Sequence, residues 1–314
     1  MSPPQVDGYR LVWSDDFNGS QGQAANLSKW DYRTGVGNSN GEIQRYTTDS
    51  GNAHLSGDGQ LYILPKKSGS SWTSARLESD GSWSCDSNKA MIFQAEIWVP
   101  DFTGSPEKYK GLWPSFWTKG LSNRNGTGWP DCGEWDILEV TNKMSNRNQG
   151  TLHFRDATGN HNGGFNGSVN YQGGQYHTWA FKVDRRGGNW MTDKLIWYLD
   201  GKEFYRVTGE MVGTLEQWKQ LAWQPYFIIL QVAVGGSYAD FPTDNTVSGY
   251  DGSMLFVNGR VLYWYENKAG SLADDFDAAN TLHSDYRYET VESHHNSICS
   301  APTSVQNTLH PALG

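Results

Sequence analysis

Short apolar runs, separated by clusters of Gly, Asn, Asp and Ser, recur along most of the chain. In some runs apolar and polar positions alternate, and in others β-branched and aromatic residues follow one another without a break. Both patterns are typical of β-strands that are covered on one or on both faces. We therefore predict strands at the following residues: 61–64, 91–99, 135–140, 178–183, 195–199, 227–234 and 260–265.

Turn signals are frequent and helix signals are scarce. Asp200-Gly201 stands between the runs 195–199 and 203–207, which is the strongest short hairpin signal in the chain. Helical periodicity is clear only at residues 214–221, where Thr214 is suited to cap the helix. The chain therefore belongs to the all-β class.

The domain organisation follows from where apolar residues stop. No repeat of fixed period and no low-complexity linker divides residues 8–266, so we predict one domain over 1–266. From residue 267 onward Asp, Ser, His and Asn replace most apolar residues. We expect residues 267–314 to form a tail that packs on the domain or extends from it.

Composition narrows the class of ligand. The net charge is −9 and the pI is about 5.3, whereas a nucleic-acid partner requires a positive surface. The 15 Trp and 16 Tyr residues are suited to pack sheets or to stack on flat ligands. With only 19% charged residues, the chain suits a neutral sugar polymer better than a nucleic acid.

Cysteines and terminal segments add little. Cys85, Cys132 and Cys299 allow at most one disulfide, and their spacing does not identify the pair. The N-terminus has no basic region followed by an apolar run, and no segment reaches the ~18–20 apolar residues of a membrane span. We expect a chain that is not inserted in a membrane.

Three carboxyl side chains stand close together, at Glu134, Asp136 and Glu139. Side chains alternate along a regular strand, so Glu134 and Asp136 share one face while Glu139 points to the other. One extra residue in a β-bulge at Ile137 or Leu138 returns Glu139 to the face of the other two. We predict such a bulge, with three carboxyls on one face and the apolar residues between them facing the core.

Such a cluster is costly, because like charges raise one another's pKa. A retaining glycosidase needs it, since an ionised nucleophile and a protonated acid must stand ~5–5.5 Å apart. An intervening Asp can share a proton with them. The alternative is a solvated strand face or a ladder of ion pairs, and this motif alone leaves both interpretations open.

The wider sequence resembles family 16 of the glycoside hydrolases, the laminarinase and lichenase group. The matching motifs occur in family order over about residues 10–265. They stand at the following positions: Val12–Phe17, Asn40–Thr47, Thr73–Leu77, Gly111–Trp117, Gly133–Val140, Thr151–His153 and Ile229–Gly236.

The resemblance implies a jelly-roll β-sandwich of two curved antiparallel sheets, with a substrate cleft across the concave face. It also implies roles for the acidic residues. Glu134 attacks the anomeric carbon and Asp136 assists it. Glu139 first protonates the leaving oxygen and then activates water, so that the β-anomer is retained.

Six further residues match family positions around the substrate: Glu42, Arg76, Trp113, Trp117, His153 and Gln231. Glu42 and Arg76 would hold sugar hydroxyls, and His153 would orient a carboxyl or contact sugar.

Trp113 would stack on a pyranose near the bond that is cut. Trp117 stands four residues further, beyond Pro114, so we expect that the two rings do not both face one way on a regular strand. Trp117 is therefore assigned to the core or to packing near the cleft.

Departures from the family leave two points open. Gln231 stands where glucanases of the family often have Asn, and the loops 82–89 and 101–110 are unusual, so the linkage is not determined. Many relatives bind Ca²⁺ behind the cleft, but Asn258 stands where Asp is common. We predict no metal or other cofactor, with a structural Ca²⁺ as the alternative.

The favoured interpretation is a secreted, monomeric endo-hydrolase of β-1,3- or mixed β-1,3/1,4-glucan. A galactan-cleaving hydrolase or a cell-wall transglycosylase of the same fold shares the chemistry up to the covalent intermediate. A β-glucan-binding protein without catalysis is a third class. Loss of either glutamate would mark that class, and both are present.

Overall fold

The structure, a computed structural model, describes residues 6, 8–37, 39–104, 107–244 and 246, and the backbone of 255–267. The chain divides into a unit of residues 1–281 and a unit of residues 282–314, and every described residue lies in the first. The predicted tail lies outside the described residues, apart from its first residue, Asn267.

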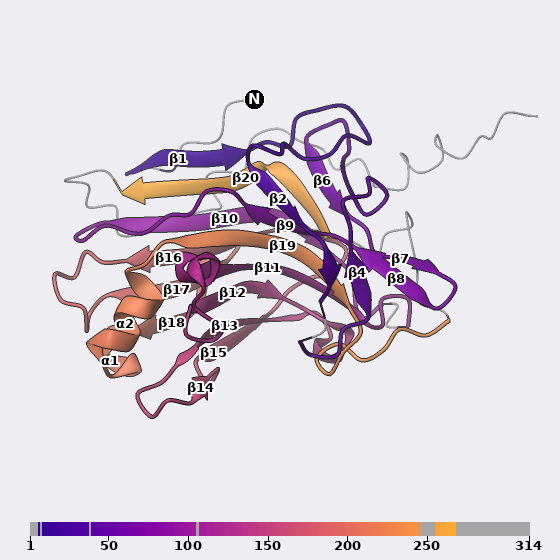
Figure 1. Cartoon of the computed structure of the whole chain (residues 1–314). Helices are drawn as coiled ribbons and strands as arrows, with labels where there is room; N and C mark the ends of the chain where they lie inside the picture. Colours follow the sequence, from indigo (N-terminus) through magenta and orange to yellow (C-terminus); the bar gives the residue numbers. More distant parts are fainter. Residues whose placement is uncertain are drawn as a thin grey trace, which may run out of the picture. The chain divides into compact units, whose positions relative to one another are not determined.

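Two large antiparallel sheets dominate the described residues (Figure 1). The first sheet has the order β18 (Lys202–Thr208), β17 (Lys194–Leu199), β16 (Gln175–Asp184), β10 (Ala90–Val99), β20 (Leu255–Asn267), β6 (Gln60–Ile63) and β5 (Ala53–Leu55), and β1 (Tyr9–Asp15) also pairs with β20. The second sheet has the order β14 (His161–Asn162), β13 (Arg147–Arg155), β12 (Glu134–Glu139), β11 (Leu112–Gly120), β19 (Tyr226–Val234), β9 (Arg76–Ser79) and β2 (Trp30–Arg33), and β15 (Asn166–Asn170) also pairs with β13.

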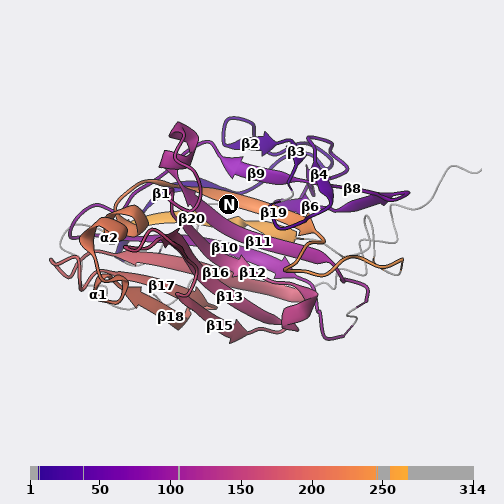
Figure 2. The same cartoon turned by 60° about the horizontal axis from the view of Figure 1, so that its bottom comes forward.

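Smaller elements lie at the two ends of these strands (Figures 1 and 2). A third sheet contains β3 (Gly35–Val36), β4 (Gln44–Tyr46), β8 (Ser71–Ser74) and β7 (Lys66–Ser68). The helices α1 (Gly209–Val212) and α2 (Leu215–Ala222) lie at the opposite end. Two 3₁₀ turns, η1 (Leu121–Asn125) and η2 (Asn142–Met144), complete the elements of the described residues.

The local sequence signals are confirmed. Every predicted strand overlaps an observed one. Asp200 and Gly201 have φ values of 49° and 76°, the left-handed conformation that a tight hairpin turn requires, and they join β17 to β18. The Thr214 hydroxyl accepts a hydrogen bond from the Gln217 backbone N–H and caps α2, whereas the short α1 was not predicted.

The main core fills the space between the two large sheets. Alternate residues of each strand point into it, as in Phe93 and Phe181 from the first sheet and Trp135 from the second. The Trp135 ring stacks on Tyr226 with centroids 3.6 Å apart and meets Phe181 at 4.5 Å. The two packed antiparallel sheets confirm the predicted all-β jelly-roll sandwich. The contacts of Trp135 anchor β12 to the core between the sheets.

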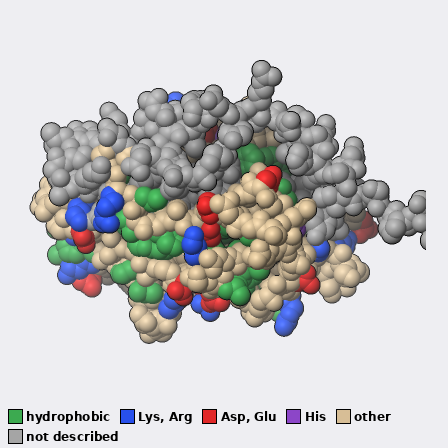
Figure 3. Space-filling model, turned by 90° about the horizontal axis from the view of Figure 1, so that it is seen from above, with side chains coloured by type: hydrophobic (Ala, Val, Ile, Leu, Met, Phe, Trp, Pro, Cys, Tyr) green, Lys and Arg blue, Asp and Glu red, His purple; other side chains and the backbone are tan. Residues whose placement is uncertain are grey.

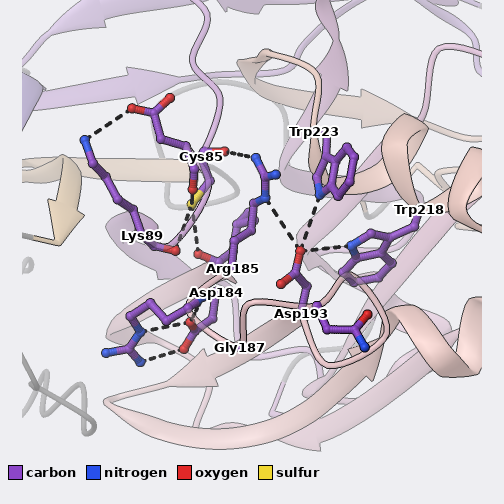
Figure 4. Close-up of polar contacts among 12 residues, drawn as sticks. Cys85, Lys89, Asp184, Arg185, Gly187, Asp193, Trp218 and Trp223 are labelled. Atoms are coloured by element: carbon purple, nitrogen blue, oxygen red, sulfur yellow. Dashed lines mark hydrogen bonds and ion pairs between the residues drawn. The ribbon is translucent and has the colours of Figure 1, made fainter.

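One buried carboxylate connects α2 to the first sheet (Figure 4). Asp193, which is 3% exposed, accepts hydrogen bonds from the indole N–H groups of Trp218 at 3.4 Å and Trp223 at 3.3 Å. The Arg185 guanidinium lies 3.6 Å from the same oxygen and donates to the Cys85 carbonyl at 2.5 Å. This network keeps α2 at the end of the sheets.

The surface carries charges of both signs. In the face drawn in Figure 3, lysine and arginine side chains lie among acidic ones and apolar patches of the described residues. Within the described part of the chain, no helix has the length and apolar character that crossing a membrane requires.

Candidate active site

A β-bulge brings the three acidic residues of β12 to one face of the second sheet. In the pairing of β11 with β12, Glu134 lies opposite Lys119, Asp136 opposite Trp117 and Glu139 opposite Ser115. The register shifts between Phe116 and Trp117, so that Ile137 has no partner on β11. The extra residue reverses the alternation beyond it, and the predicted bulge is confirmed at Ile137.

Asn148 of β13 holds the bulge. Its side chain is fully buried, and its amide N–H donates to the Ile137 carbonyl at 3.0 Å. Its amide oxygen accepts from the Glu139 backbone N–H at 2.8 Å. These are the two backbone groups that the bulge removes from regular pairing, so a single side chain satisfies both.

Burial raises the pKa of all three carboxyls, and the charges of neighbouring carboxylates raise the pKa values of Glu134 and Glu139 further. Burial is the largest cause for Glu134, and the charge of Asp136 adds to it, which raises the pKa of Glu134 to about 7. Burial raises the pKa of Asp136, against the positive charge of Lys119. For Glu139, burial and then the charges of Asp136 and Glu134 raise the pKa well above its ordinary range.

The two glutamates therefore ionise in a definite order. Lys119 lies beside Glu134, and its charge lowers the pKa of that carboxyl, whereas it does not contribute at Glu139. Glu134 consequently loses its proton first and Glu139 keeps its proton. A carboxylate and a carboxylic acid can exist side by side on this strand, as a nucleophile and an acid require.

His153 of β13 stands opposite Glu134 in the sheet. Its Nε2 is 3.1 Å from Asp136 Oδ2 and 3.9 Å from Glu134 Oε1, and its Nδ1 is hydrogen-bonded to His161 Nε2 at 2.8 Å. The structure thus places His153 between the acidic residues on one side and the His161 ring on the other.

Trp113 and Tyr238 contact the acid from the other side. The indole N–H of Trp113 donates to Glu139 Oε1 at 3.2 Å. The Tyr238 ring lies 4.7 Å from the Trp113 ring, and its hydroxyl, which donates to Met144 Sδ at 3.3 Å, lies near enough to Glu139 to lower the pKa of that carboxyl. The indole N–H of Trp113 holds the carboxyl of Glu139 at a fixed position above β11.

The prediction that Trp113 and Trp117 do not face one way is wrong. β11 runs unbroken along β19, and residues four apart on a strand share a face. The intervening Phe116 belongs to the main core, whereas Trp113 and Trp117 pack in two separate small clusters outside it. Both rings therefore belong to the face that carries the acids.

A row of paired residues leads from Glu139 on β12 across β11 and β19 to β9. Glu139 is opposite Ser115, which is opposite Gln231 of β19, which in turn is opposite Arg76 of β9. The Arg76 guanidinium lies 4.8 Å from the Trp117 ring centroid and 3.5 Å from Gln231 Oε1. The structure therefore brings Arg76, Gln231 and Trp117 together on the acidic face.

Among the predicted site residues, Glu42 has no described contact that connects it to Glu134, Asp136 or Glu139. It bridges to Gly235 beyond the end of β19, and its carboxylate accepts from the Asn40 backbone N–H at 2.7 Å. The predicted contact of Glu42 with substrate stays a prediction. The side chain of Asn258 lies outside the described residues, so the calcium prediction also stays open.

The donor atoms of Glu134, Asp136 and His153 lie within 4.8 Å of one another, which is close enough for a metal ion. The same three groups are the candidate nucleophile, its neighbour and the histidine that contacts both. An ion bound there would occupy the nucleophile, so the geometry fits acid–base chemistry without requiring a metal.

Sequence reasoning missed several residues of this site. Trp129 lies in the loop before β12; its ring centroid is 4.5 Å from that of His161, and its indole lies near enough to Glu134 to lower the pKa of that carboxyl. Lys119, Tyr238 and Asn148 were missed as well. Only Lys119 carried a usable signal, because it stands two residues after Trp117 and shares its face.

The family model described as "XgeA-like, catalytic GH16 domain" matches residues 30–187, which is half of the chain. The chain belongs to glycoside hydrolase family 16. Its match to the family includes β12 and the bulge, so the acidic residues of this site lie inside the catalytic domain that the family model describes.

Relatives in family 16 include glucan endo-1,3-beta-glucosidase A1 of Niallia circulans, 29% identical over 77% of this chain and 36% of that protein. The beta-glucanase of Rhodothermus marinus is 29% identical over 73% of this chain and 77% of that protein. The chain thus spans about a third of the length of the first relative.

The fold of this family 16 chain is also seen in a solved structure. The endo-1,3-beta-glucanase from Streptomyces sioyaensis has a TM-score of 0.74 at 25% identity, and the match covers 85% of this chain and 99% of that one.

Proposed function

We propose that this protein is an endo-hydrolase of β-1,3-glucan or mixed β-1,3/1,4-glucan that retains the anomeric configuration. The observation that carries the proposal is the bulge at Ile137, which sets Glu139 on the face of Glu134 and Asp136. Similarity to glucan endo-1,3-beta-glucosidase A1 and to a beta-glucanase supports the choice of glucan.

In the first step the Glu134 carboxylate attacks the anomeric carbon and forms a bond to it. The glycosidic C–O bond breaks, and Glu139 gives its proton to the departing oxygen. The raised pKa of Glu139 keeps that proton available, and the hydrogen bond from Trp113 holds the carboxyl in place.

In the second step Glu139, now a carboxylate, takes a proton from water. The water oxygen attacks the anomeric carbon, and the bond to Glu134 breaks. Asp136 lies between the two glutamates and can share a proton with either of them as their protonation states change. Two inversions at one carbon restore the β configuration.

The substrate would lie across the strands of the second sheet. Trp113 and Trp117 offer aromatic faces for pyranose rings, and Arg76 and Gln231 offer polar groups for their hydroxyls. All of these residues come from one chain, so the site is complete in a monomer. Because cell-wall glucan lies outside the plasma membrane, we place the activity outside the cell.

The test is a panel of laminarin, lichenan, cellulose, galactan and xylan, with products sized by chromatography and the first anomer followed by ¹H NMR. We expect mid-length oligosaccharides from laminarin or lichenan alone and the β-anomer first. Cleavage of galactan, transfer to sugar acceptors, or tight glucan binding without cleavage would each replace the proposal by its alternative.

A matched variant assigns the role of Glu134. Glu134→Gln keeps the size of the side chain and removes the nucleophile, so turnover should fall at least about 10³-fold while glucan still binds. Turnover above a tenth of the wild-type value would contradict this assignment.

A further inference from the structure

A cavity of about 590 Å³ lies at the edge of the second sheet, among residues of β2, β3, β4 and β9. Figure 2 shows β2 and β9 beside the strands of the third sheet. It is lined by Arg33–Gly37, Tyr46, Arg76, Glu78, Asn123 and Arg124. Three of these side chains are guanidinium groups and one is a carboxylate. Asp31 also pairs with Arg33, at 3.5 Å, so three guanidinium groups face two carboxylates and the cavity keeps a positive excess, although the net charge of the chain is −9.

The cavity continues the face that carries the acids. Arg76 is opposite Gln231 on one side and opposite Arg33 of β2 on the other, in the same row as Glu139. Three strand spacings separate β12 from β9, or ~14 Å. A sugar in this cavity therefore belongs to the chain that is cut, a few residues from the reacting bond.

The carboxylate of Glu78 is buried and already accepts three hydrogen bonds from arginines. Its Oε1 accepts from Arg76 Nη2 at 2.7 Å and Nε at 3.0 Å, and its Oε2 accepts from Arg33 Nε at 2.8 Å. Arg124 Nη2 lies 3.7 Å from Oε2. Burial favours the neutral form of Glu78, but the charges and hydrogen bonds of Arg76 and Arg33 outweigh it and lower its pKa, so the carboxylate stays ionised.

Several donors of the cavity lack an acceptor. Within the described residues no acceptor contacts the terminal amino groups of Arg33, a side chain that is 47% exposed. Arg76 Nη1 has only the distant Gln231 oxygen at 3.5 Å, and the buried Nε of Arg124 has none. The two Nη groups of Arg124 donate to the carbonyls of Ser79 and Asp80, which fixes this guanidinium at the wall.

A surplus of donors and positive charge decides which ligand fits. A neutral sugar hydroxyl both donates and accepts, so it could use Thr34, Tyr46 or Asn123 of the lining but would leave the positive charge of the arginines without a counter-ion. A carboxylate or a sulfate ester presents several acceptor oxygens and a negative charge, and a planar guanidinium binds such groups with two parallel hydrogen bonds. Long-range steering is excluded by the negative net charge, so any selection is local.

Resting on the proposed function, we infer that this arginine cavity selects a glucan residue that bears an anionic substituent, either a carboxylate or a sulfate ester. Arg33 supplies the exposed fork that reaches the substituent. Arg76 and Arg124 supply the positive wall behind it.

The probes are laminarin, laminarin partly oxidised to the 6-carboxylate, and laminarin partly sulfated, each at the same low degree of substitution. For the wild-type protein we expect a higher kcat/KM on a substituted glucan than on laminarin. The two substituted probes separate the carboxylate from the sulfate. The preference should shrink as salt is added, because ions screen an exposed guanidinium.

Arg33→Gln should reduce the preference roughly tenfold by loss of a charge-assisted hydrogen bond, with little change on laminarin itself. Arg206→Gln is the matched control, since Arg206 is 48% exposed and also pairs with one glutamate, Glu203, but lies on β18 of the first sheet. It should leave the preference unchanged.

Equal kcat/KM on all three glucans, or a preference that Arg33→Gln does not alter, would overturn the inference while leaving the glucanase in place. Failure to cleave any glucan would instead overturn the proposed function. The two failures are therefore distinguishable in one set of rate measurements.

Discussion

Asp136 contributes to the titration of both glutamates, because its charge adds to the effect of burial in raising the pKa of Glu134 and of Glu139. Asp136→Asn removes that charge, so both pKa values should fall. The acid limb of the kcat/KM profile reports ionisation of Glu134, and the alkaline limb reports loss of the Glu139 proton. We expect both limbs to move to lower pH.

The control is Asp131→Asn, which removes an exposed carboxylate in the loop before β12. Asp131 pairs with Arg155 and does not contribute to the pKa of either glutamate. Its profile should match the wild type. A profile for Asp136→Asn that stays in place, or moves to higher pH, would show that Asp136 is uncharged when the glutamates titrate.

The cluster of Glu134, Asp136 and His153 should make zinc an inhibitor and not a cofactor. Carboxylate and imidazole groups bind Zn²⁺ well, and an ion there would occupy the nucleophile. We expect unchanged turnover after dialysis against EDTA, inhibition by added Zn²⁺, and weaker inhibition in His153→Gln. The measurement is the initial rate on glucan, and a loss of activity with EDTA that added Ca²⁺ or Zn²⁺ restores would contradict it.

At the residue scale, the sequence identifies the acidic residues because three carboxyls stand close together along one strand. It does not identify Tyr238 or Trp129, since their contacts with Glu139 and Glu134 depend on how two loops fold back. Asn148 is hidden for a different reason. A single Asn between Arg147 and Gln149 carries no pattern that points to the bulge.

At the scale of elements, the bulge of β12 is the feature on which the site depends, and Asn148 is the residue that positions it. Asn148→Leu keeps the volume but leaves the Ile137 carbonyl and the Glu139 N–H buried without partners, which costs about 2–4 kcal/mol. We expect kcat to fall roughly 100-fold with little change in KM, because a carboxyl displaced by ~1 Å transfers its proton poorly.

A stability loss alone would not identify a positioning role, so the comparison is with Asn52→Leu. Asn52 is also buried and makes two side-chain hydrogen bonds, to the Leu64 carbonyl and the Thr47 hydroxyl, away from β12. Thermal melting should show similar losses in both variants. If kcat of Asn148→Leu equals that of Asn52→Leu, Asn148 has no specific role in the reaction.

The elements themselves were largely predictable, and the one error is instructive. Alternation located the strands, and Asp200-Gly201 located a hairpin, because both depend on local backbone rules. The orientation of Trp113 and Trp117 was misjudged because Pro114 was taken to interrupt the strand. Pairing with β19 on one side keeps β11 straight through Pro114.

For the whole molecule, the pattern predicted an all-β chain and the family resemblance implied two sheets, but neither predicted how distant segments join. The Asp193 network links the start of β17, the end of β16, the loop at Cys85 and α2, which are far apart in sequence (Figure 4). No periodicity in the sequence identifies Asp193, because its contribution to stability depends on contacts with Arg185, Trp218 and Trp223. Such junctions become visible only in three dimensions.

This network should contribute strongly to stability. Asp193→Ala leaves the guanidinium of Arg185, whose side chain is 13% exposed, without its carboxylate and leaves two indole N–H groups without an acceptor. Loss of one partner of a buried pair costs about 3–5 kcal/mol, so Tm should fall by roughly 5–15 °C. Glu203→Ala, which removes an exposed partner of Arg206, should leave Tm nearly unchanged, and equal melting of the two variants would show that α2 is held by its apolar face alone.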